Sequence, residues 1–137
     1  MIKPTAAQRA LAVQFFKFGI IGAMGFGVDY GFFHLGLDVF GFGRYGGALF
    51  SFPFAVTATW FGNRQFTFRG THKGRASAQW ARFFMACAIG LVLNRGTYSL
   101  MIAAFPLVYQ YPVLGLLGGT AAAMFFNFFA AKRLVFR

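Results

Sequence analysis

Two halves of this chain resemble each other, which restricts it to folds built from a duplicated unit. The segment Trp60-Phe-Gly-Asn-Arg-Gln-Phe-Thr-Phe-Arg69 returns as Phe128-Phe-Ala-Ala-Lys-Arg-Leu-Val-Phe-Arg137. Upstream, several residues recur with the same spacing in both halves. Lys17-Phe18, Gly25, Asp29 and Gly31 match Arg82-Phe83, Gly90, Asn94 and Gly96. Many small transporters consist of duplicated hydrophobic helix pairs. We therefore predict one membrane domain over residues 1–137, with repeat 1 at 15–69 and repeat 2 at 80–137.

The solvent of this chain is expected to be lipid. Hydrophobic residues make up 58% of it and charged residues only 11%, and it contains no Glu. A soluble domain carries charge on about a quarter of its positions. Too few polar side chains are present to cover a surface that faces water.

Four apolar segments reach the length of about 20 residues that a helix needs to cross a bilayer. Glycine-rich, polar or proline-containing stretches separate them, at 41–43, 70–77 and 106–112. We predict an all-α integral membrane protein with four transmembrane helices. The predicted spans are 15–37, 46–66, 83–105 and 112–131.

Basic residues indicate the orientation, because Lys and Arg collect on the cytoplasmic side. They cluster before the first span, around the central loop and after the fourth span, whereas the other two connections hold only Arg44. Both termini and the central loop are therefore predicted to be cytoplasmic. Each half then begins and ends on the same side, so the repeats are parallel, related by an axis along the membrane normal. Residues 4–14 fit either a short amphipathic surface helix or a frayed tail.

Three polar residues are predicted to lie near the bilayer centre. Asp29 is twelve residues beyond Lys17, and Asn94 and Arg95 follow Arg82 at a similar interval. At 1.5 Å per residue this is a depth of about 18 Å. A charge there is costly and is commonly functional. Either Asp29 and Arg95 pair with each other, with Asn94 completing the hydrogen bonds, or the three line a polar cavity for an anionic or hydroxyl-rich head group.

A second polar layer is predicted at the cytoplasmic ends of the second and fourth spans. Basic residues there attract lipid phosphates, although they also serve as ordinary topology anchors. The asparagines are not orientation signals, and hydrogen bonds between helices are an alternative role for them. The members of this layer are Asn63, Arg64, Asn127, Lys132 and Arg133.

Other chemistries find little support in the sequence. The net charge of +11 lies in short clusters between apolar runs, so we expect no nucleic-acid partner. Cys87 is the only cysteine and sits in an apolar run. We identify no metal-ligating cluster, catalytic triad or phosphate-cradling loop, and expect neither covalent catalysis nor a cofactor.

Several of these motifs together resemble the GtrA-like family. They are the Phe-Lys-Phe-x-x-x-Gly start at 16–22, the mid-span Asp29, the Asn-Arg-x-Phe-x-Phe tail at 63–68, and Asn127-Phe with the Lys-Arg-Leu-Val-Phe ending at 132–136. The resemblance covers residues 15–137. The chain departs from the family pattern at Ala131, which stands where the first half has Asn63.

The resemblance implies a non-enzymatic, multi-pass protein of the cytoplasmic (inner) membrane that flips a polyprenyl-phosphate-linked monosaccharide for polysaccharide synthesis beside a membrane glycosyltransferase. It places Asn63-Arg64 and Lys132-Arg133 at the lipid phosphate and Asp29 on the head-group path. Two alternatives remain: a non-transporting anchor for such a glycosyltransferase, and a small multidrug exporter, which the absence of Glu and the presence of Arg95 disfavour. Four spans form a thin wall around a large head group, which favours a homodimer.

Overall fold

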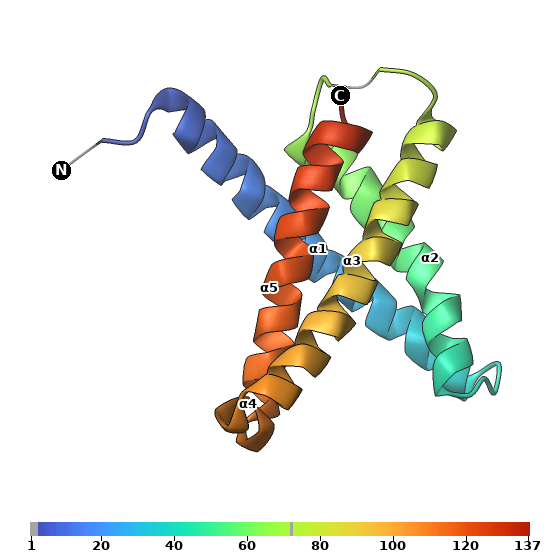
Figure 1. The fold of residues 1–137 in the computed structure, drawn as a ribbon. Coiled ribbons are helices and arrows are strands. Elements are labelled where there is room, and N and C mark those ends of the chain that lie inside the picture. Colours follow the sequence, from blue (N-terminus) through green and yellow to red (C-terminus); the bar gives the residue numbers. More distant parts are fainter. Residues whose placement is uncertain (1–2, 72) are drawn as a thin grey trace.

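The computed structural model describes residues 3–71 and 73–137, and all regular secondary structure among them is helical. Four long helices dominate: α1 (Ala6–Asp38), α2 (Arg44–Gly62), α3 (Ala76–Ala104) and α5 (Pro112–Ala130) (Figure 1). Each predicted apolar segment is thus helical. The predicted break at 106–112 contains the short helix α4 (Pro106–Gln110), which Pro106 can begin because the first turn needs no backbone N–H donor there.

Helix α1 begins well before the predicted span. The Thr5 hydroxyl accepts a hydrogen bond from the Gln8 backbone at 3.3 Å, and the Gln8 side chain accepts one from the Thr5 backbone at 2.8 Å. This reciprocal capping box satisfies backbone donors that a helix start leaves free. Residues 6–14 therefore form neither a separate surface helix nor a frayed tail, but continue directly into the apolar part of α1.

Three helical segments are long and apolar enough to cross a membrane: Ala6–Asp38, Ala76–Ala104 and Pro112–Val135. Helix α2, with 19 residues, is not among them. Large apolar side chains such as Phe26, Leu49 and Val92 are exposed on the helices, as expected for surfaces that face lipid.

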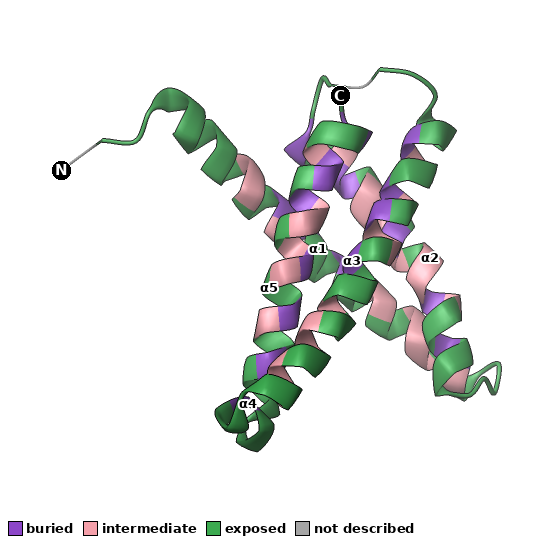
Figure 2. Cartoon of the chain, in the orientation of Figure 1, coloured by how far each residue is buried: buried purple, intermediate pink, exposed green. Residues whose placement is uncertain are grey.

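The helices form two hairpins, in which α1 packs along α2 and α3 along α5. The hairpins meet at the end that holds the C-terminus and diverge toward the opposite end (Figure 1). Figure 2 shows buried residues gathered where the hairpins meet, and exposed residues dominating the opposite end.

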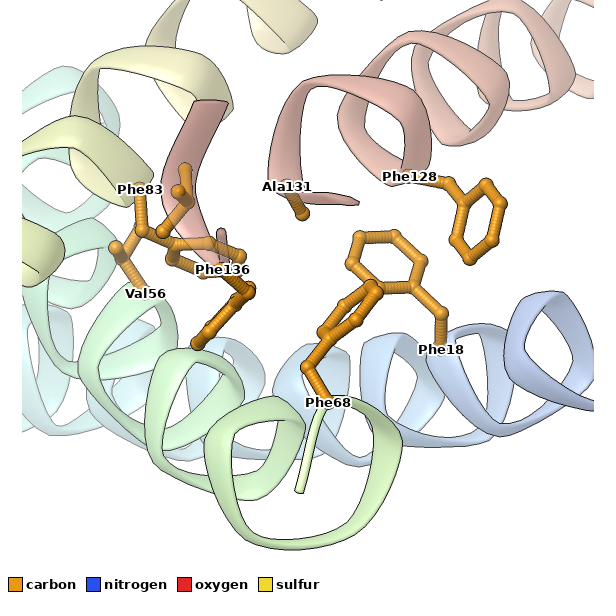
Figure 3. Packing of buried hydrophobic residues seen from close by; sticks show 8 residues of the cluster. Phe18, Val56, Phe68, Phe83, Phe128, Ala131 and Phe136 are labelled. Atoms are coloured by element: carbon orange, nitrogen blue, oxygen red, sulfur yellow. The ribbon is translucent and has the colours of Figure 1, made fainter. Parts of the chain in front are cut away.

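Each hairpin closes with one turn of π-helix, η1 (Asn63–Thr67) and η2 (Ala131–Val135). The Phe68 N–H donates to the Asn63 carbonyl and the Phe136 N–H to the Ala131 carbonyl, both at 2.8 Å. These wider turns direct both phenylalanines into the core, where their rings stack with centroids 4.8 Å apart. Phe18, Phe83 and Phe128 surround this stack (Figure 3).

Candidate functional site

A hollow of about 350 Å³, called the central cavity below, opens between the two hairpins, and a few polar side chains lie in its mostly apolar lining. All four long helices contribute to it: α1 with Asp29, α2 with Thr59, α3 with Asn94 and α5 with Asn127. A second hollow of about 420 Å³ adjoins it and shares Asn94 and Asn127. Three residues predicted as site residues from the sequence, Asp29, Asn94 and Asn127, thus line one space.

Asp29 is held in this cavity by one hydrogen bond from α2. The hydroxyl of Ser51, which is fully buried, donates to Asp29 Oδ1 at 2.7 Å. Within the described residues, the other carboxylate oxygen has no hydrogen-bond partner. A carboxylate can accept several hydrogen bonds, so Asp29 retains capacity to accept one from a hydroxyl group in the cavity.

Asn127 carries a second unused acceptor. Its Oδ1 atom is buried and has no hydrogen-bond partner in the described structure. A buried acceptor left in this state costs about 1–3 kcal/mol. The amide rests against Gly90, where an added Cβ would lie 2.2 Å from Oδ1. Asp29 therefore offers an acceptor to the donors of an occupant, whereas the Asn127 oxygen would first have to turn away from Gly90.

Arg95 lies outside this cavity. It follows Asn94, and neighbouring residues of an α-helix point about 100° apart, so only Asn94 faces the space between the hairpins. Arg95 is exposed. Among the described residues it forms no ion pair with Asp29, whose partner is Ser51. Contact between Arg95 and a head group stays a prediction.

The predicted cytoplasmic layer ties the two hairpins together. Arg64 Nη1 donates to Gln79 Oε1 on α3 at 2.6 Å, and Lys132 Nζ donates to Gln14 Oε1 on α1 at 2.5 Å. Each bond joins the closing π-turn of one hairpin to the first helix of the other. Our sequence reasoning missed both glutamines, although each precedes a matched cation, Lys17 or Arg82, by three residues.

The remaining residues of this layer differ in exposure. Asn63 is 1% exposed, and its side-chain oxygen accepts a hydrogen bond from the Thr67 hydroxyl at 2.8 Å. Arg133 is exposed, with its guanidinium 5.6 Å from the centre of the Phe129 ring. Direct contact of either residue with a lipid phosphate stays a prediction.

The bond between Arg64 and Gln79 is expected to contribute measurably to stability. Gln79 is 3% exposed, and a hydrogen bond to a charged donor is worth about 1.5–3 kcal/mol. We expect Gln79→Ala to lower the free energy of unfolding in detergent by about 1–2 kcal/mol, with much of this loss shared with Arg64→Ala in a double-mutant cycle. The matched cycle of Gln79→Ala with Arg133→Ala should show no coupling, and equal coupling in both cycles would contradict this role.

Comparison with known families identifies one relationship. The family model described as GtrA/DPMS, transmembrane domain, matches residues 17–136. A search of curated proteins found no match. The matched range includes every residue of the central cavity and both hairpins except residues 6–16 at the start of α1.

Proposed function

The chain belongs to the GtrA/DPMS transmembrane-domain family, and on this basis we propose that it flips a polyprenyl-phosphate-linked monosaccharide across the cytoplasmic membrane for cell-surface polysaccharide synthesis. It is a multi-pass membrane protein with apolar helices. The family connects it with polyprenyl-phosphate sugars, and translocation of such a lipid is our own proposal.

The proposed topology has four spans, with α2 as the second, and places both termini and the central loop in the cytoplasm. The cations Arg64 and Lys132 support it, because both lie at the end where the hairpins meet. The two halves would be parallel repeats around an axis along the membrane normal. In favour of this, Phe68 and Phe136 hold matching positions in the two halves and stack directly on each other.

The observation that carries the proposal is the unused carboxylate oxygen of Asp29 in the cavity between the hairpins. Asp29 lies about 18 Å along α1 from Lys17, close to the middle of a hydrocarbon core about 30 Å thick. A sugar is rich in hydroxyl groups, and Asp29 could accept a hydrogen bond from one of them. The Asn127 amide oxygen could accept another once its side chain turns into the cavity. The prenyl chain would remain in lipid, against the exposed apolar helix faces. No bond is made or broken, and movement follows the gradient of the lipid.

Reconstitution into liposomes tests this function directly. Vesicles would contain a polyprenyl-phosphate sugar with a labelled head group, and a membrane-impermeant reagent would measure the label exposed outside. We expect the protein to speed the appearance of inner-leaflet label, with no effect on a labelled phosphatidylcholine. Equal movement of both lipids would indicate a nonspecific leak. Movement of neither would overturn the proposal and favour the anchor for a glycosyltransferase.

A further inference from the structure

Two further hollows, one in each hairpin, lie away from the central cavity. In the first hairpin, a hollow of about 520 Å³ lies between α1 and the closing turn η1. Two exposed cations line it, Lys17 from α1 and Arg69 just beyond η1. Its apolar wall includes Ile20 and Phe66, which are both exposed. None of its lining residues belongs to the central cavity.

The second hairpin contains a matching hollow of about 460 Å³. Its cations are Arg82 and Arg137, and its apolar wall includes the exposed Met85 and Leu134. These residues match those of the first hollow by the same sequence offsets that relate the two halves. Asp29 and Asn94 are also matched positions, yet there the charge differs. A cation pair beside an exposed apolar wall is therefore present in both halves, while other polar positions differ.

Neither cation pair has an acidic partner. The chain contains only two acidic residues, Asp29 and Asp38. Asp29 is bound to Ser51, and Asp38 pairs with His34 at 3.5 Å. Arg82 donates to the Leu134 backbone carbonyl at 3.5 Å, which leaves its charge unneutralised. No acidic side chain of the protein therefore supplies a counter-charge to either pair.

We propose that these hollows are two docking sites for the phosphate of membrane lipids, one in each hairpin. Two cations match a phosphomonoester, which carries about −1.5 to −2 charges near neutral pH. The adjoining apolar walls fit the chain of a lipid and would be unused by free phosphate. The inference does not depend on translocation, because the sites would bind such a lipid whether or not the protein moves it.

Native mass spectrometry of the full chain in detergent tests the proposal with phosphatidic acid, and with phosphatidylcholine of the same acyl chains. We expect the wild type to retain two phosphatidic acid molecules and no phosphatidylcholine. Lys17→Ala/Arg69→Ala and Arg82→Ala/Arg137→Ala should each retain one, with affinity at the altered site about 30-fold weaker. Because Arg82 also bonds to the backbone, Arg137→Ala alone provides a milder variant of the second site.

Lys73→Ala/Arg75→Ala is the matched control, because it removes the same charge from the exposed central loop. It should still retain two phosphatidic acid molecules. An equal loss in this control would show diffuse attraction to anionic lipid and overturn the proposal. Displacement of the lipid by millimolar inorganic phosphate would identify free-phosphate sites instead. A wild type that retains only one phosphatidic acid would overturn the paired arrangement.

Discussion

Replacing Asp29 by leucine and Ser51 by alanine together should slow lipid translocation at least about tenfold and leave the protein folded. The double substitution removes both partners of the 2.7 Å hydrogen bond from Ser51 to Asp29, so no buried polar group is left unpaired. The cavity loses its only carboxylate, and the loss of one charge-assisted hydrogen bond to a sugar hydroxyl should slow movement at least about tenfold. The liposome assay gives the rate, and thermal unfolding in detergent gives the stability.

Asp38→Leu is the matched control, since Asp38 is the only other acidic residue and lies exposed at the end of α1. It should translocate at the wild-type rate. Asp29→Asn separates charge from hydrogen bonding, because its amide oxygen can still accept from Ser51. Wild-type movement by the Asp29→Leu/Ser51→Ala variant would show that the carboxylate only holds α1 to α2.

The sequence predicted which polar residues lie at the same level along the helices better than which way each one faces. Asp29 and Asn94 do share a cavity, as the matched intervals from Lys17 and Arg82 suggested. Arg95 was predicted beside them because it has the same depth. Depth follows from the rise per residue, whereas direction depends on which side of α3 packs against α5. A span that is apolar on nearly all sides gives little indication of that side.

Helix ends also differ in how well the sequence predicts them. The capping box at Thr5 and Gln8 follows a recognisable sequence pattern, which apolar run length alone does not reveal. The π-turns had no comparable signal. Each one alters the register by a residue at the end of its hairpin, and η1 in this way buries Asn63 and brings Arg64 to Gln79. Contacts between hairpins of this kind depend on the assembled fold rather than on any local pattern.

Among the glycine-to-alanine substitutions in α5, Gly119→Ala is expected to be the most destabilising. An added Cβ would lie 2.5 Å from the Asn94 backbone carbonyl oxygen, so α3 and α5 would have to separate. Overpacking of this kind costs about 1–3 kcal/mol, which thermal or denaturant unfolding in detergent would measure. Because Asn94 lines the central cavity, translocation should fall as well.

Two further glycines provide the controls for this prediction. At Gly118 an added Cβ meets only the flexible side chain of Met101, and at Gly96 it meets nothing within 4 Å. Gly118→Ala should therefore cost less than Gly119→Ala, and Gly96→Ala should be neutral or stabilise α3 by up to about 1 kcal/mol. If all three variants unfolded alike, the close approach of α3 and α5 at Gly119 would not exist in the membrane. A loss of stability and of translocation confined to Gly119→Ala would instead place the contact between α3 and α5 and the central cavity in one packed unit.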